Sequence, residues 1–310
     1  MEYRKFGQTD LNLSLVGFGG APLGNVFGGI DPGDGVKVVH QAVDSGINFF
    51  DTSPYYGITL AEERLGAALA GRRQRVILAT KCGRYGLAEF DFSAQRVAAS
   101  MDESLRRLQT DYVDLYQAHD IEFGDVQQII DETIPALRQL QQQGKTRYIG
   151  ITGYPPKLLR RIAETVPVDS ILSYCHYNLL NTSMDEVLTD FCRKRGIGLI
   201  NASGLHMGLL TNNGGPAWHP APQEVRDAAR KAAQYCLDQG ADISELGLRF
   251  CLDHPYVSST LVGISTTRDL EASLKVLQSS TNAELLRQVK AILAPVFNCE
   301  WPSGRPENRE

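Results

Sequence analysis

The chain has 310 residues, of which 43% are hydrophobic and 22% charged, and these ordinary values exclude a disordered or fibrous protein. Its formal net charge is −5 and its longest basic run is Arg193-Lys194-Arg195, which argues against a nucleic-acid or anionic-membrane surface. No stretch approaches the ~18 consecutive apolar residues of a membrane span. A small molecule is therefore the expected partner.

The N-terminus and the cysteines bear on the compartment. The segment Met1-Glu2-Tyr3-Arg4-Lys5-Phe6 is charged from its second residue and lacks an apolar signal core, so we expect a cytoplasmic protein. Cysteines without close pairs in such a chain are expected to be free thiols, mostly buried in the core. They are Cys82, Cys175, Cys192, Cys236, Cys251 and Cys299. We expect a monomer or a weak homo-oligomer.

Short apolar, β-branched runs alternate with longer segments of helical periodicity, which is typical of parallel strands each followed by a crossover helix. The predicted strands are residues 15–18, 48–51, 76–81, 113–118, 148–152, 170–174, 198–201 and 260–262. The predicted helices are residues 34–45, 61–70, 94–108, 126–142, 156–164, 184–194, 244–253 and 268–277. Gly46, Gly144 and Gly196 each follow a predicted helix, where a left-handed residue would end it.

Several segments lie outside this repeat. Residues 3–6 and 11–15 flank Gly7-Gln8-Thr9-Asp10 and predict an N-terminal β-hairpin that closes the bottom of the barrel. The segments predicted to cover the barrel mouth or its flank are the Gly/Pro-rich stretch 212–222, extra helices at 224–239 and 282–294, and the polar tail 301–310. The predicted fold is α/β, a (β/α)8 TIM barrel forming a single domain over residues 1–310.

Four chemically suited side chains fall at the ends of consecutive predicted strands, where the active site of such a barrel lies. Asp51 ends the second strand, Tyr56 follows in the next loop, Lys81 ends the third and His119 follows the fourth. A neighbouring ammonium lowers the pKa of a tyrosine, and a carboxylate keeps a buried lysine charged. Lys81 is placed for the first role and Asp51 for the second. His119 would donate a hydrogen bond to the reacting oxygen.

Each residue alone also has a structural interpretation. Asp51 fits an N-cap or turn residue, Tyr56 a rim aromatic and His119 a satisfied core histidine. Lys81 is harder to explain structurally, because it ends the apolar run Val76-Ile77-Leu78-Ala79-Thr80 and would be partly buried. Coincidence is much less plausible for the four together.

The sequence resembles the aldo-keto reductase superfamily over nearly its whole length. The stretches that carry the resemblance are Gly17-Phe18-Gly19-Gly20, Asp51-Thr52-Ser53-Pro54-Tyr55-Tyr56-Gly57, Glu62-Glu63-Arg64-Leu65-Gly66, Ala79-Thr80-Lys81, Ser104-Leu105-Arg106-Arg107-Leu108, Asp111-Tyr112-Val113-Asp114-Leu115-Tyr116 and Gly144-Lys145-Thr146-Arg147-Tyr148-Ile149-Gly150. The resemblance implies that Asp51, Tyr56, Lys81 and His119 form the family's catalytic tetrad. It also implies an extended nicotinamide dinucleotide bound across the mouth, consistent with the absence of a Rossmann Gly-x-Gly-x-x-Gly turn.

The resemblance implies a set of cofactor contacts, with departures from the usual pattern. Thr152-Gly153 stands where most members carry Ser-Asn, Tyr174 where Gln is usual, and Ala202 where an aromatic stacks on the nicotinamide. The expected cofactor-binding residues are Gly20, Thr152, Tyr174, Ser203, Leu205, Gly208, Gly263, Ser265, Thr266, Arg268 and Asp269. These departures, with Ser173-Tyr174-Cys175-His176-Tyr177-Asn178 and His119-Asp120-Ile121-Glu122-Phe123, resemble the L-galactose dehydrogenase branch and its relatives acting on L-fucose and similar aldoses.

The expected cofactor is NAD, with NADP as the open alternative. Gly263 and Asp269 align with the Lys and Arg that bind the 2′-phosphate in NADP-preferring members, and a carboxylate would favour a free 2′-hydroxyl. Arg268 could serve a phosphate if the loop shifts by one residue. Asp269 also fits a simple helix N-terminal charge.

The leading functional hypothesis is oxidation of an aldose such as L-galactose, L-fucose or L-gulose at C1 to its lactone, with hydride passing to NAD. Tyr55, Asp120 and His176 are expected to contact the sugar, and no metal site is predicted. The alternatives are an NADPH-dependent aldehyde or ketone reductase, a cofactor-binding regulatory subunit like the potassium-channel β subunits, and a class I aldolase with Lys81 as Schiff-base nucleophile.

Overall fold

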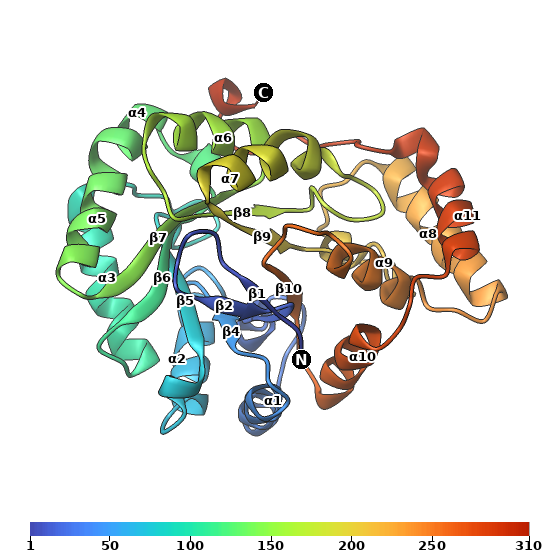
Figure 1. Cartoon of the computed structure of the whole chain (residues 1–310), viewed down its shortest axis with the longest axis horizontal. Helices are drawn as coiled ribbons and strands as arrows, with labels where there is room; N and C mark the ends of the chain where they lie inside the picture. Colours follow the sequence, from blue (N-terminus) through green and yellow to red (C-terminus); the bar gives the residue numbers. More distant parts are fainter. Residues whose placement is uncertain (310) are drawn as a thin grey trace.

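The computed structural model describes residues 1–309, and its centre is a closed barrel of eight parallel strands surrounded by helices (Figure 1). The barrel strands are β3 (Val16–Gly19), β4 (Phe49–Asp51), β5 (Ile77–Cys82), β6 (Val113–Ala118), β7 (Thr146–Gly153), β8 (Ser170–Tyr174), β9 (Gly198–Ala202) and β10 (Ser259–Gly263). They pair in chain order, and β10 pairs with β3 to close the barrel. The predicted (β/α)8 fold is confirmed.

Eight helices connect or follow the barrel strands, in the order predicted. They are α1 (Pro32–Asp44), α2 (Leu60–Ala68), α3 (Ala94–Leu108), α5 (Ile134–Gln142), α6 (Pro156–Thr165), α7 (Asp190–Arg195), α9 (Ile243–Leu252) and α10 (Thr267–Leu277). Short 3-10 helices lie at Ala21–Gly24, Arg73–Arg75, Ile121–Phe123, His206–Gly208, Ala294–Val296 and Pro306–Asn308. Gly46, Gly144 and Gly196 all have positive φ, as their expected helix-ending role requires.

Two predicted helices are less regular than the sequence suggested. A π-helical turn at Ile129–Thr133 separates α4 (Val126–Gln128) from α5, and another at Asp185–Thr189 precedes α7. A π-turn inserts one residue without changing the apolar character of the segment, so periodicity does not reveal it. Helix α1 begins at Pro32, earlier than predicted, because the Asp31 carboxylate accepts a hydrogen bond from the Gly33 N–H at 2.8 Å and caps the helix there.

The N-terminal hairpin closes the end of the barrel opposite the active-site loops. Strand β1 (Tyr3–Lys5) pairs antiparallel with β2 (Asn12–Ser14), as predicted. Phe6, Leu11 and Leu13 are buried within the apolar cluster that fills the barrel interior. The Gln8 N–H also donates to the Gly196 carbonyl, just before β9 begins. Small molecules therefore reach the barrel only from the carboxyl ends of the strands.

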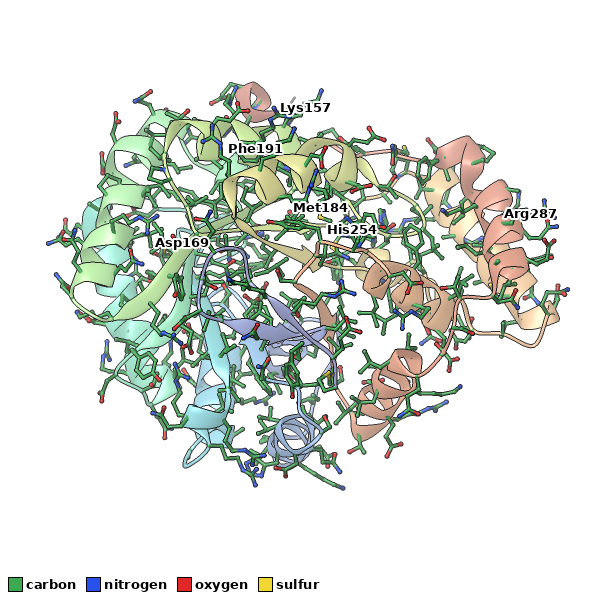
Figure 2. All side chains as sticks on the ribbon, viewed as in Figure 1. Lys157, Asp169, Met184, Phe191, His254 and Arg287 are labelled. Atoms are coloured by element: carbon green, nitrogen blue, oxygen red, sulfur yellow. The ribbon has the colours of Figure 1, made fainter. Side chains whose placement is uncertain are left out.

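Two helices outside the eight-fold repeat lie side by side at one flank of the barrel (Figure 1). Helices α8 (Gln223–Asp238) and α11 (Ala283–Leu293) share an apolar cluster with Leu209 and Leu210, which follow β9. Arg287 projects outward from α11, where it pairs with Glu284 (Figure 2). The flank position predicted for the extra helices is therefore correct.

The remaining sequence-based expectations concern thiols and membranes. All six cysteines are free, and five are buried, as expected for core residues. No helix within residues 1–309 is long and apolar enough to cross a membrane.

A glycine at the contact between α2 and α3 generates a stability prediction. A Cβ on Gly66 would overlap the Arg107 carbonyl oxygen and lie 2.7 Å from the Leu108 Cα, so backbone atoms would have to move. We expect Gly66→Ala to lower the free energy of unfolding by about 1–3 kcal/mol despite alanine's better helix propensity. Chemical denaturation measures this.

The matched control is Gly35→Ala in α1, where the new Cβ would meet its nearest neighbour, the Leu23 Cδ2, at 3.4 Å. This variant should be as stable as the parent or more stable by up to about 1 kcal/mol. Equal destabilisation of both variants would contradict the steric explanation.

Candidate active site

The structure brings the four predicted catalytic side chains together at the carboxyl ends of β4, β5 and β6. Asp51 ends β4, Lys81 lies on β5, and His119 follows β6. The Lys81 ammonium forms a short ion pair with Asp51 Oδ1, donates to the Thr52 carbonyl at 2.8 Å, and lies 3.4 Å from the Tyr56 hydroxyl. The Tyr56 and His119 rings meet edge-on, 5.7 Å apart.

The Asp51–Lys81 pair is almost completely enclosed, with side-chain exposures of 3% and 1%. Burial raises the pKa of Asp51, and the charge of Lys81 opposes this shift. Burial lowers the pKa of Lys81, but the Asp51 carboxylate, together with the Tyr56 hydroxyl, outweighs burial, and the net shift of the Lys81 pKa is upward. Each charge therefore depends on the other, and Lys81 carries its proton at neutral pH.

Gln117 is a member of this site that sequence reasoning missed. Its side-chain amide donates to Asp51 Oδ2 at 3.1 Å, so both carboxylate oxygens of Asp51 are occupied. Gln117 lies opposite Lys81 in the β5–β6 register. The alternation of side chains along a strand could have revealed it. Leu115 points into the barrel, and Gln117, two residues further along β6, lies on the same face.

Tyr56 is the group suited to exchange a proton with a substrate, but its acidity departs from the prediction. Lys81 lowers its pKa, as expected, yet burial outweighs this and raises the pKa of Tyr56 to about 12. The phenol is therefore the resting form. Lys81 acts by making the phenolate less costly than it would be in the same site without a cation.

His119 is held by a residue that the prediction also omitted. Its Nδ1 lies 3.0 Å from the Ser53 hydroxyl oxygen, which accepts the Tyr55 N–H at 3.1 Å. The Ser53 hydroxyl is thus free to donate to Nδ1, an arrangement that favours the Nε2–H form of the ring. Burial lowers the pKa of His119 to about 3, so the ring is neutral and presents an N–H donor.

Beside His119 lies a charged pair that includes the predicted substrate residue Asp120. Its carboxylate pairs with Arg84, and the Arg84 guanidinium lies over the ring of Tyr55, 3.7 Å from its centre. Two predicted substrate residues, Tyr55 and Asp120, are therefore joined by one residue that the prediction did not include. Little in the sequence indicated this role, because Arg84 is one of many arginines in loops.

Glu122 and the C-terminal tail support the same loop. Glu122 is fully buried, and its Oε1 accepts hydrogen bonds from the Tyr154 N–H and from the hydroxyls of Tyr174 and Ser303. Burial, with Asp120 nearby, raises the pKa of Glu122 to about 8. Asn308 donates to the backbone carbonyls of Glu122 and Gly124, so the tail fastens the segment that follows His119 and Asp120.

His176, the third predicted substrate residue, joins a different cluster. Its ring is fully buried against Tyr154, with ring centres 4.4 Å apart, and its Nδ1 lies 2.7 Å from the Ser183 hydroxyl. Trp301 packs on the other side of this cluster through Tyr154. The structure thus gives His176 a packing role, and its contact with a sugar stays a prediction.

The expected cofactor residues lie along the barrel mouth. Gly20 follows β3, Thr152 and Tyr174 lie at the ends of β7 and β8, and Gly263 ends β10. Ser203, Leu205 and Gly208 form the loop after β9, in which Ser203 and Gly208 have positive φ. Thr152 Oγ1 accepts the Asp120 N–H at 3.4 Å.

Ser265, Thr266, Arg268 and Asp269 form the start of α10. Asp269 Oδ2 accepts the N–H groups of Ser265 and Thr266, and the Thr266 hydroxyl accepts the Asp269 N–H, which makes a capping box. The structural alternative for Asp269, a helix N-terminal charge, is therefore realised. Arg268 is exposed beside it.

These residues fit a nicotinamide dinucleotide. The four side chains are suited to proton transfer, but amino-acid side chains do not accept hydride, so an oxidoreduction at this site would need such a cofactor. Thr52 Oγ1, directly after Asp51, is buried without a hydrogen-bond partner among the described residues. A Schiff-base role for Lys81 is disfavoured, because that nucleophile needs a lowered pKa and this ammonium has a raised one.

Substitution of Tyr56 tests the proton-transfer role. We expect Tyr56→Phe to reduce kcat by about 100-fold or more while leaving the Kd for the nicotinamide cofactor nearly unchanged, since only the hydroxyl is removed. Steady-state kinetics and cofactor fluorescence titration measure the two. Tyr3→Phe, which removes the hydroxyl of an exposed tyrosine in the N-terminal hairpin at the opposite end of the barrel, is the control and should keep kcat. A Tyr56→Phe enzyme with normal turnover would remove this role.

The neutral state of His119 predicts a pH response. Because its folded pKa is about 3, His119 should not titrate between pH 5 and 8, whereas an ordinary histidine would gain a proton below about pH 6.5. We expect the ratio of kcat/KM between the parent and His119→Asn to stay constant over this range. Other titrating groups are common to both proteins and cancel. A ratio that changes several-fold around pH 6.5 would show that His119 is protonated there.

Comparison with known proteins agrees with this geometry. Residues 15–294 match the model of the aldo/keto reductase family. The chain is 49% identical to the L-galactose dehydrogenase of Arabidopsis thaliana, over 99% of each chain, and 33% identical to the D-arabinose 1-dehydrogenase of Saccharomyces cerevisiae, over 87% of each. A solved aldo-keto reductase from Bacillus halodurans, in its holo form, superposes with a TM-score of 0.81 at 29% identity over the whole of both chains.

The barrel, the buried ion pair with its tyrosine and histidine, and these matches lead to one conclusion: the chain belongs to the aldo-keto reductase family and is an NAD(P)-dependent oxidoreductase.

Proposed function

We propose that this enzyme oxidises an aldopyranose of the L-galactose type at C1, with hydride passing to NAD and the sugar leaving as its lactone. The observation that carries the proposal is the charged and hydroxylated rim beside the tetrad. Asp120, Arg84 and the Tyr55 ring border His119, and such a surface suits a polyhydroxylated substrate better than an apolar carbonyl compound. The 49% identity to a protein named L-galactose dehydrogenase supports it.

The four tetrad residues take distinct roles in this reaction. Tyr56 is a phenol at rest, so it first releases its proton to solvent. The resulting phenolate, stabilised by Lys81, then accepts the proton of the C1 hydroxyl. Asp51, itself held by Gln117, keeps Lys81 charged and in place. His119 donates its Nε2–H to the C1 oxygen and orients it. The bound nicotinamide supplies the hydride acceptor.

We assign the cofactor to the predicted mouth residues and propose a preference for NAD. Gly263 carries no charge, and Asp269 puts a carboxylate at the start of α10, close to the expected adenosine ribose. The capping box uses one carboxylate oxygen of Asp269 and leaves its negative charge in place. That charge favours a free 2′-hydroxyl over a 2′-phosphate. Arg268, exposed one residue earlier, is the group through which NADP would bind instead.

The test is absorbance at the reduced-nicotinamide band with L-galactose, L-fucose and L-gulose, each offered first with NAD and then with NADP. We expect rapid NAD reduction with one of the three sugars and at least ten-fold lower kcat/KM with NADP, the usual size of one lost charge interaction. Rapid reduction of aldehydes by NADPH, with no oxidation of any of the sugars, would replace this proposal with the aldehyde reductase alternative.

A further inference from the structure

The Arg84–Asp120 pair is built unlike an ordinary surface ion pair. Asp120 is 4% exposed and adopts a left-handed backbone conformation with φ of 52°, which a non-glycine residue rarely does. Its two carboxylate oxygens have different neighbours. Oδ2 accepts a hydrogen bond from Arg84, whereas Oδ1 lies 3.7 Å from Nε2 of His119, too far for a direct hydrogen bond.

Arg84 is fixed by aromatic rings. Its guanidinium stacks on Tyr55 and lies 5.3 Å and 5.5 Å from the ring centres of Phe90 and Phe123. Those two phenylalanines stack on each other at 4.5 Å, nearly parallel. A planar cation held in this way gives Asp120 Oδ2 one fixed partner. Oδ1 is therefore the oxygen left to face the reacting centre.

The 3.7 Å between His119 Nε2 and Asp120 Oδ1 matches a specific substrate feature. His119 donates to the reacting oxygen. A hydroxyl on the adjacent carbon lies about a hydrogen-bond length from that oxygen and has a proton to donate. When the reacting oxygen sits at Nε2, this second hydroxyl comes within reach of Oδ1.

We infer that Asp120 accepts a hydrogen bond from the hydroxyl on the carbon adjacent to the reacting carbon, and that Arg84 is the positioning residue that aims Asp120 at it. The enzyme thereby selects 2-hydroxy carbonyl compounds and the corresponding vicinal diols over simple aldehydes and alcohols. If the substrate is a sugar, which rests on the proposed function, the hydroxyl that Asp120 binds is the C2 hydroxyl of the aldopyranose.

The test compares glycolaldehyde with propanal in the reductive direction, using NADH and, in parallel, NADPH. The two aldehydes are close in size, and one carries a hydroxyl where the other carries a methyl group. The measured quantity is the ratio of their kcat/KM values, corrected for the fraction of free aldehyde. Both values come from one sample, so the active fraction cancels from the ratio.

We expect the ratio to fall about 10- to 100-fold in Asp120→Ala, the usual effect of losing a charged hydrogen-bond acceptor, and less in Asp120→Asn, which keeps an amide oxygen. Arg84→Met should also lower the ratio, while Arg84→Lys should recover part of it by restoring the charge. Arg84 is the less enclosed partner, so its variants decide the matter if the Asp120 variants do not fold.

The matched control is Asp114→Asn. Asp114 is a buried aspartate on β6, paired with Arg73 and Arg147 near the start of the strand rather than at the mouth. Its substitution should leave the ratio unchanged. A ratio that stays constant in the Asp120 and Arg84 variants, or that falls equally in Asp114→Asn, would overturn the inference. Because the assay needs no sugar, failure of the L-sugar oxidation would overturn the proposed function and leave this result standing.

Discussion

The ion pair between Asp51 and Lys81 is the constraint on which the active site depends. Two charges removed from water are costly, and their attraction compensates only when the remaining hydrogen-bonding capacity is also satisfied. Here the Thr52 carbonyl accepts a second hydrogen bond from Lys81, and the Gln117 amide donates a hydrogen bond to the second Asp51 carboxylate oxygen. These partners come from β4, β5 and β6, so the pair is stable only when the three strands hold one register, and barrel closure fixes that register.

The same burial sets the protonation states around the pair. It raises the pKa of Tyr56 and lowers that of His119, so both are neutral at rest, the first as a phenol and the second as an imidazole. Charge is thus confined to the Asp51–Lys81 pair and, at the rim, to Arg84 and Asp120. A phenol beside an ammonium donates its proton to a carbonyl oxygen directly, whereas accepting a proton from an alcohol requires the phenolate, which Lys81 makes easier to form.

Sequence patterns predicted the barrel and the tetrad because both follow from local rules. Strand ends such as Asp51 and Lys81 are visible as polar residues after apolar runs, and barrel topology places such ends together. Residues that hold another site residue by a hydrogen bond or ion pair could not be predicted from such a pattern. Gln117, Ser53 and Arg84 become recognisable only when strand register and loop path bring them against Asp51, His119 and Asp120. The acidity of Tyr56 was likewise misjudged, because a sequence shows neighbouring charges but not the extent of burial.

The C-terminal tail is part of the site, although it is remote from the tetrad in sequence. Ser303 and Asn308 bond to Glu122, three residues after His119, whereas the N-terminal hairpin closes the opposite end of the barrel. The two termini are therefore not equivalent positions for an added affinity tag or fused partner. An extension at the N-terminus begins at the end of the barrel opposite the catalytic loops, while one at the C-terminus begins beside the segment that follows His119 and Asp120.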